Sequence, residues 1–260
     1  MKKLILLFLV IFTGCKSDKE ASPVTHEIIL ENISKTFKSL DVVKEHVRFV
    51  NTVHSSREIL VIEGGTFLEG MTNDDGAVKL YGGRISKDFI NNRGAVYING
   101  KNEVFIEGAF KSIGQPTLSK HRNPTNGLRI TVGEKPLEAS SAVFDEHTEI
   151  NVVLTDDFPS FSVIDVKTGL YFGSRTIFNF EKSNKKPIPK GTKFKLFRAK
   201  TIHLSQSNLD DRARYPIEYR GSSAATNYTG ADLDSIEITK EKDPNFEYLV
   251  VTVKKEITPS

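Results

Sequence analysis

Short runs of β-branched and aromatic residues, each closed by glycine, proline or asparagine, recur along most of this 260-residue chain. The segments between the runs lack the apolar periodicity of helices, which argues against alternating β-α units. The main runs are EILVIE (58–63), GAVKLY (76–81), AVYINGKNEVFIE (95–107), LRITV (128–132), INVVL (150–154), FSVIDV (161–166), RTIFNF (175–180), TKFKLFRAK (192–200) and EYLVVTVKK (247–255). Short strands with this punctuation predict a mainly β fold, an antiparallel β-sandwich or barrel-like domain.

One stretch near the N-terminus departs from this pattern. Within SLDVVKEHVRFVNTV (39–53), Ser39 can cap a helix and Asp41 suits the positive end of its dipole. Apolar residues recur there at helical spacing, at Leu40, Val43, Val47 and Val50. The sequence therefore predicts one N-terminal helix.

The clearest turn signal is the Asn99-Gly100 pair, which lies between two β-rich runs within residues 95–107. Asparagine and glycine tolerate the positive φ that tight hairpin turns require. We therefore expect two strands joined there by a hairpin turn.

The chain begins with two lysines and a short apolar run from Leu4 to Phe12, followed by Thr13-Gly14-Cys15. A basic start, a short apolar core and small residues after it are the parts of a secretory signal peptide. The apolar run is far below the roughly 20 residues that span a bilayer as a helix. Cys15 is the only cysteine, so a disulfide within the chain is excluded.

The tetrad Phe12-Thr13-Gly14-Cys15 resembles the lipobox of bacterial lipoproteins. The resemblance implies cleavage before Cys15 and attachment of diacylglycerol to its sulfur, so that the membrane becomes a partner of the protein. The charged residues 16–20 are similar to those that accompany export to the cell surface in Bacteroidota lipoproteins. The expected location is the outer membrane, with the protein lipid-anchored and exposed at the surface.

Three parts follow from this reading: a signal peptide over 1–14, the lipidated Cys15 with a tether over 15–26, and a β-rich extracytoplasmic domain over 27–260. The stretch 114–127 is loop-like throughout, and a seam between two smaller units would fall there.

Composition excludes several classes of function. Removal of Lys2 and Lys3 leaves the mature chain nearly neutral, so global charge gives no case for nucleic acid as a partner. The six histidines show no metal-ligand spacing and phosphate-binding or dinucleotide fingerprints are missing, so no metal or other cofactor is expected.

The strongest charge feature is KSNKKPIPKGTKFKLFRAK (182–200), which holds eight basic residues and no acid. Lys193 and Lys195 would extend from one face of a strand beside the loop lysines Lys185 and Lys186. Such a line of positive charge could bind an anionic polysaccharide. The alternative is a lysine-protected edge strand that discourages aggregation.

Candidates for catalysis lie just downstream, in and before LDDRARYPIEYRG (209–221). Arginine can neutralise a uronate carboxylate, while tyrosine or histidine can serve as base and acid in eliminative cleavage. The residue types therefore suit a polysaccharide lyase, although surface arginines in ion pairs explain the same pattern. The candidates are His203, Arg212, Tyr215 and Tyr219.

One stretch resembles a family of enzymes. ILVIEGGTFLEGMTNDDGAVKLYGGRI (59–85), followed by NRGAVYINGKNEVFIEG (92–108), looks like the opening of bacterial phosphodiester glycosidases over about residues 58–108. The same residues can also be read as coils of a β-helix, as in pectate-lyase-like enzymes. IEGGTF (62–67) and VFIEGAF (104–110) would then be successive rungs. This second reading ranks lower because few rungs follow at a constant spacing.

The sequence thus favours a lipid-anchored envelope protein with a binding or assembly role, whose ligand could be an anionic extracellular polysaccharide. The alternative is an extracellular enzyme that acts on glycans. A cluster of histidine, tyrosine and arginine around one cleft would favour the enzyme.

Overall fold

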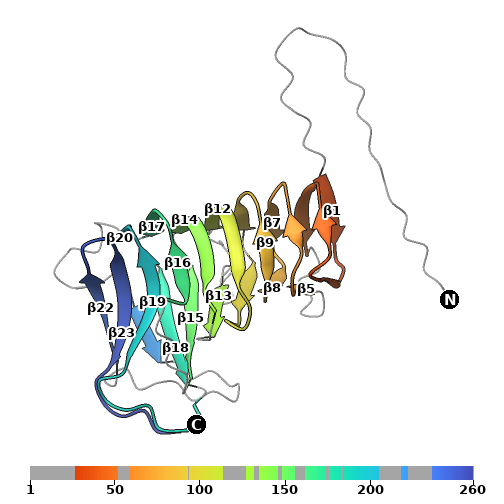
Figure 1. The fold of residues 1–260 in the computed structure, drawn as a ribbon. Coiled ribbons are helices and arrows are strands. Elements are labelled where there is room, and N and C mark those ends of the chain that lie inside the picture. Colours follow the sequence, from red (N-terminus) through yellow and green to blue (C-terminus); the bar gives the residue numbers. More distant parts are fainter. Residues whose placement is uncertain are drawn as a thin grey trace, which may run out of the picture.

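The computed structural model describes residues 27–51, 59–92, 94–113, 127–131, 135–145, 148–155, 162–173, 176–182, 184–204, 218–221 and 236–259. These residues form strands, turns and bends (Figure 1). The expectation of a mainly β protein is therefore confirmed. The described residues contain no helix, and hence none long and apolar enough to cross a membrane.

The described strands form two sheets. The first sheet contains β1 (Glu27–Glu31), β3 (Val42–Val43), β4 (His46–Val50), β6 (Thr66–Phe67), β7 (Met71–Asp74), β9 (Gly83–Ile85), β10 (Phe89–Asn92), β12 (Val104–Ile113), β14 (Leu137–Phe144), β16 (Ile164–Val166), β17 (Gly169–Phe172), β19 (Lys193–Ala199), β20 (Thr201–Leu204), β22 (Ile236–Lys242) and β23 (Glu247–Val253). The second contains β2 (Lys35–Phe37), β5 (Ile59–Ile62), β8 (Ala77–Leu80), β11 (Ala95–Ile98), β13 (Gly127–Thr131), β15 (Glu149–Leu154), β18 (Ile177–Lys182) and β21 (Glu218–Gly221).

The chain winds from one sheet to the other and back, so that each strand pairs with the equivalent strand one winding later. Every described pair from β1 to β21 is parallel, for example β4 with β7, β7 with β10, and β10 with β12. Figure 1 shows these strands stacked side by side from β1 at one end to β22 and β23 at the other. The described fold is therefore a coil of mostly parallel strands.

The prediction of antiparallel pairing was wrong for these strands. Parallel neighbours need a long connection between them, and here the rest of each coil supplies it. Short turns redirect the chain from one sheet to the other instead of reversing it beside itself. The ladders also continue across the stretch 114–127, because β11 pairs with β13 and β12 pairs with β14.

The predicted N-terminal helix was also wrong, because residues 42–43 and 46–50 form β3 and β4. Within β4, Val47 and Phe49 are fully buried while Arg48 between them is exposed. This alternation is that of a strand with one face in the core, and β-branched valines suit it.

The Asn99-Gly100 turn exists, but it does not form a hairpin. Gly100 adopts a φ of 61°, as the turn prediction requires. The preceding strand β11 belongs to the second sheet, whereas β12 belongs to the first. The turn therefore joins two sheets of one coil.

The first coils follow a regular period. Ile59, Ala77 and Ala95 are partners in successive coils, so each coil is 18 residues long at this position. The rung IEGGTF (62–67) aligns with LYGGRI (80–85), because Ile62 pairs with Leu80 and Phe67 with Ile85. VFIEGAF (104–110) belongs to the coil after that, since β12 pairs with β9. The two segments that the β-helix reading took as successive rungs are therefore two rungs apart.

A column of buried amides runs through these coils. Asn73 and Asn91 are register partners, and both are fully buried. Nδ2 of Asn73 donates to Oδ1 of Asn91 at 2.7 Å and to the carbonyl of Gly76 at 3.0 Å. Nδ2 of Asn91 in turn donates to the carbonyl of Gly94 at 2.9 Å. Each amide is thus bound to the turn that follows its own strand, and the hydrogen bond between the two amides joins neighbouring coils.

The two glycines of these turns leave room for the column. A Cβ atom at Gly94 would lie 2.1 Å from Nδ2 of Asn73 and 2.8 Å from Oδ1 of Asn91. A Cβ atom at Gly76 would lie 2.2 Å from the ring of Phe49. Side chains at either position are therefore excluded by the packing of the column.

Phenylalanines continue the core toward the C-terminal coils. Phe144 follows Ser112 in the same column as the amides, and its ring is 5.5 Å from the rings of both Phe110 and Phe172. It also contacts Phe197 with the ring centroids 5.8 Å apart. Phe144 is fully buried, so it joins neighbouring coils through aromatic contacts.

An antiparallel hairpin of β22 and β23 ends the coil. β23 pairs antiparallel with β19 on one side and with β22 on the other. Glu247 at the start of β23 accepts a hydrogen bond from the backbone N–H of Ile202 at 2.6 Å and lies 2.8 Å from Nζ of Lys240. This carboxylate therefore ties the hairpin to β20.

We expect Glu247→Gln to lower the free energy of unfolding by about 1.5 kcal/mol at neutral pH, because it removes the charge from these hydrogen bonds. Burial alone would raise the pKa of Glu247, but the hydrogen bonds from Ile202 and Lys240 outweigh it and leave the pKa lowered. A lowered folded pKa gives stability that is present above the ordinary value of 4.5 and is lost as the pH falls through the folded pKa. Urea unfolding should therefore show a difference between wild type and variant that is constant from about pH 6 to 8 and shrinks below about pH 4.5.

The control for this prediction is Glu237→Gln, which alters a more exposed carboxylate of the same hairpin in an ion pair with Lys254. It should change stability by less than about 1 kcal/mol. A Glu247→Gln difference that stays constant far below the ordinary carboxyl pKa would contradict the role of the ionised carboxylate.

Candidate functional site

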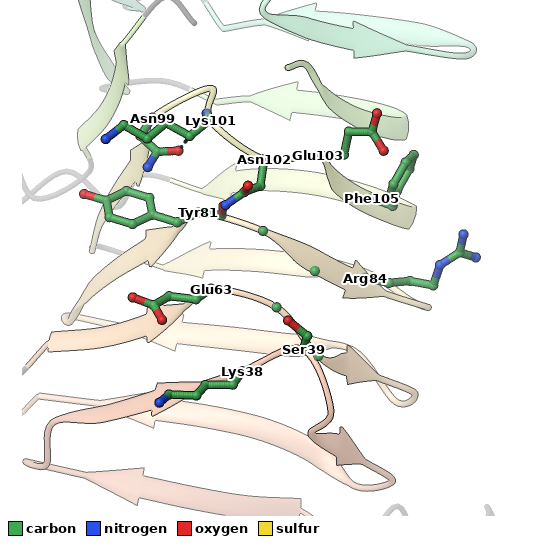
Figure 2. Close-up of a pocket in the computed structure, with 14 residues that line it drawn as sticks. Lys38, Ser39, Glu63, Tyr81, Arg84, Asn99, Lys101, Asn102, Glu103 and Phe105 are labelled. Carbon is green, nitrogen blue, oxygen red and sulfur yellow. Dashed lines mark hydrogen bonds between the residues drawn. The ribbon is translucent and has the colours of Figure 1, made fainter. Parts of the chain in front are cut away.

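An open groove of about 980 Å³ crosses the turns that leave the second sheet. These turns follow β2, β5, β8 and β11, and they stack on one another in successive coils. Figure 2 shows the groove in close-up. Its lining residues are Lys38, Ser39, Glu63, Gly64, Gly65, Tyr81, Gly82, Gly83, Arg84, Asn99, Lys101, Asn102, Glu103 and Phe105.

The register of the strands determines which residues form one wall of the groove. Phe37, Ile62, Leu80 and Ile98 are partners in successive coils, so the residues that follow them occupy equivalent positions. In Figure 2 the side chains of these following residues extend to the same side of the stacked turns. The wall therefore presents one polar side chain per coil, at Lys38, Glu63, Tyr81 and Asn99.

Glycine pairs allow the turns to stack this closely. Gly65 and Gly83 adopt φ values of 90° and 105°, which residues other than glycine rarely adopt. A Cβ atom at Gly82 would lie 2.6 Å from the carbonyl oxygen of Glu63. The floor of the groove is therefore backbone, with the side chains held along its edges.

The opposite wall combines an aromatic ring with charged groups. The guanidinium carbon of Arg84 lies 5.5 Å from the ring centroid of Phe105, and Arg84 also forms an ion pair with Glu107. Glu103 forms an ion pair with Lys135 at 3.4 Å. Figure 2 shows Arg84, Glu103 and Phe105 on the side away from Tyr81.

Between the walls, the side chain of Asn102 is held by a hydrogen bond from its Nδ2 to the carbonyl of Tyr81 at 2.8 Å. Burial raises the pKa of Tyr81, and nearby Tyr97 raises it further. The Tyr81 phenol is therefore a neutral donor and acceptor at physiological pH.

The groove offers hydroxyl, carboxylate, amide and ammonium groups beside two aromatic rings. Such a set can donate to and accept from a ligand rich in hydroxyls while the rings contact its apolar faces. Within the described residues, no group of three or more His, Cys, Asp or Glu side chains is placed to hold a metal ion.

Of the four residues predicted for catalysis, the structure describes the strand positions of His203 and Tyr219. Arg212 and Tyr215 lie outside the described residues. Tyr219 lies on β21 in the second sheet, whereas His203 lies on β20 in the first. His203 stacks on Tyr171, with ring centroids 4.4 Å apart and planes at 6°. His203 does not line the groove.

The predicted basic segment 182–200 is described except at residue 183. Lys185 and Lys186 are exposed in the turn before β19, and Lys193 and Lys195 lie two residues apart on that strand. Nζ of Lys193 forms an ion pair with Glu241 at 2.5 Å. Nζ of Lys195 lies 4.8 Å from the ring centroid of Tyr248. The C-terminal hairpin therefore engages both strand lysines.

Comparisons with known proteins found no match: no family model, no curated protein and no solved structure matches the chain.

Proposed function

We propose that the protein is a lipid-anchored cell-envelope protein that binds a linear extracellular polysaccharide along the groove. The observation that supports this proposal is the stacking of four turns, each of which adds one polar side chain to the same wall.

The spacing of the coils suits a polymer. Neighbouring strands lie about 4.8 Å apart, so equivalent side chains repeat along the groove at that interval. A chain of sugar units can meet the same kind of wall at successive positions, whereas a single small molecule would use only part of it. Hydrogen bonds with Glu63 and Asn99, and ring contacts with Tyr81, match the polar edges and apolar faces of such units.

The charged groups that line the groove are compatible with an acidic polysaccharide as the ligand. Lys38 and Lys101 bring ammonium groups to it, while Arg84 is already paired with Glu107. The basic segment of Lys185, Lys186, Lys193 and Lys195 remains a separate proposal for a polyanion contact. The enzymatic alternative has less support, because His203, its one candidate whose side chain the structure describes, does not line the groove.

Attachment to the outer membrane through Cys15, with exposure at the surface, rests on the sequence of the N-terminus. A surface location would give the groove access to extracellular glycans. The two parts of the proposal are therefore consistent with each other.

The groove is tested by retention of the purified protein in gels that contain neutral, uronate-rich or sulfated polysaccharides. Tyr81→Ala should weaken retention by about tenfold in apparent affinity, equivalent to about 1.4 kcal/mol. The matched control is Tyr97→Ala, which removes a neighbouring tyrosine that does not line the groove. Equal loss of affinity in both variants, or no retention of the wild type on any of the polysaccharides, would contradict the proposal.

The same assay separates the groove from the basic segment. A variant with Lys185, Lys186, Lys193 and Lys195 all changed to Gln should keep its affinity if the groove is the site. If the lysines bind the polymer, affinity should fall and lose its salt dependence, because exposed charges are screened over about 10 Å at 0.1 M salt.

A further inference from the structure

Most of the exposed large apolar side chains of the described residues lie in the first coil, residues 27–45, which contains β1, β2 and β3. Six large apolar residues are exposed, and only Leu68 and Tyr171 lie beyond this coil. The other four are Ile29 at 56% exposure, Ile33 at 41%, Leu40 at 94% and Val42 at 60%. Large exposed apolar side chains concentrated at one end of a coil make that end a candidate for a surface that another body covers.

The opposite end of the coil is built differently. Its edge strand β22 carries charged residues, and Glu237 and Glu241 form ion pairs with Lys254 and Lys193. Charged edge strands discourage further pairing. The two ends therefore differ in chemistry, and most of the exposed large apolar side chains of the described residues lie at the N-terminal end.

We propose that the first coil rests on the surface of the lipid bilayer, with Ile29, Leu40 and Val42 in its interfacial layer. This inference rests on the proposed lipid attachment at Cys15. Residues 16–26 separate that cysteine from β1, and a segment of this length spans at most about 40 Å even when fully extended. The lipid would therefore hold the first coil close to the membrane at all times.

The charges of the first coil suit zwitterionic lipid headgroups. Three lysines and four acidic residues are interspersed along it, so neither a strongly anionic nor a strongly cationic surface is favoured. These residues are Glu27, Glu31, Lys35, Lys38, Asp41, Lys44 and Glu45.

A second copy of the chain fits this surface less well. Antiparallel pairing of β1 with its own copy about Ile29 would place Glu27 directly opposite Glu31, and like charges in that position are destabilising. Four exposed apolar side chains are also few beside the roughly 20–30 residues that each partner contributes to a stable interface.

The orientation has a consequence for the groove. Lys38 and Ser39 at its N-terminal end belong to the first coil, whereas Asn99 and Phe105 belong to later coils. A coil that stands on its first turn would therefore direct the groove away from the membrane and toward extracellular polymer.

The test uses the full-length lipoprotein, reconstituted in vesicles of phosphatidylcholine and phosphatidylethanolamine. A Leu40→Cys variant is labelled with an environment-sensitive fluorophore, which reacts only there if Cys15 is acylated. The matched control carries the label at Lys242→Cys on β22, where the side chain is 72% exposed. We expect nitroxide groups on the lipid chains to quench the Leu40 label at least about threefold more than the Lys242 label. Equal quenching would overturn the proposal.

Two further measurements distinguish membrane contact from self-association and from loss of the anchor. Changing Ile29 and Val42 to Ser should reduce quenching at position 40 while vesicle flotation stays unchanged, since the lipid still holds the protein. A blue shift of the Leu40 label that occurs without quenching by lipid and grows with the protein-to-lipid ratio would indicate a second copy and overturn membrane contact. If Cys15 of the unaltered chain reacts with maleimide and the protein does not float with vesicles, the lipid anchor itself fails, and the docking proposal with it.

Discussion

Gly94→Ala is expected to lower the free energy of unfolding by roughly 3 kcal/mol, from overpacking of the core and loss of buried hydrogen bonds. The added methyl would lie 2.1 Å from Nδ2 of Asn73 and 2.6 Å from the carbonyl oxygen of Gly76. Neither group can move freely, because Asn73 is hydrogen-bonded to both Asn91 and Gly76. Urea unfolding followed by circular dichroism measures the loss.

The matched control is Gly127→Ala in the following coil. Gly127 pairs with Ala95, the residue after Gly94, and a Cβ atom there would meet nothing within 4 Å. Its substitution should change stability by less than about 0.5 kcal/mol. Similar midpoints for both variants would show that the amide column tolerates a methyl group, contrary to the packing described.

Phe144→Ala should lower the free energy of unfolding by about 4 kcal/mol, because it removes a large buried side chain and leaves a cavity. Phe144 contacts the rings of Phe110, Phe172 and Phe197, so neighbouring coils lose contacts on both sides. Coiled folds are stabilised mainly by contacts between neighbouring windings. We therefore expect the variant to unfold at a lower urea concentration. The unfolding transitions of the coils before and after Phe144 should also become partly separated.

Tyr171→Ala is the control for this prediction. Tyr171 pairs with Val143, the residue beside Phe144, but it is outward and 47% exposed. Tyr171→Ala should lower the free energy of unfolding by less than about 1 kcal/mol, not counting the loss of the ring contact with His203. A Phe144→Ala variant as stable as Tyr171→Ala would contradict the aromatic core.

The strands could be predicted from sequence better than their partners. Runs such as EYLVVTVKK and INVVL mark β23 and β15, because alternating or continuous apolar residues reflect local burial. The choice between parallel and antiparallel pairing depends on which distant strand lies alongside, and no local pattern encodes it. The prediction of a helix near Val43 and Val47 was wrong because i, i+4 spacing also fits the inward residues of two short strands with a turn between them.

The internal repeats of the sequence carry a signal that could have predicted the groove. MTNDDGAVKL (71–80) and FINNRGAVYI (89–98) share asparagine, glycine, alanine and valine at equivalent positions, and the glycine pairs at 64–65 and 82–83 follow the same period. Aligned by that period, Glu63 and Tyr81 fall on one wall. The charge pattern instead predicted a site at Lys193 and Lys195. Their partners Glu241 and Tyr248 come from strands distant in sequence, so the local pattern could not indicate these contacts.

The regular period of the first coils makes the length of the groove an adjustable quantity. Because Ile59, Ala77 and Ala95 occupy one position in three windings, gain or loss of a whole 18-residue unit preserves every register between the remaining strands. Each such unit would lengthen or shorten the groove by about 4.8 Å, the separation of adjacent strands. Duplication of one winding is thus a simple route by which proteins of this architecture could match polymers of different repeat length without redesign of the core.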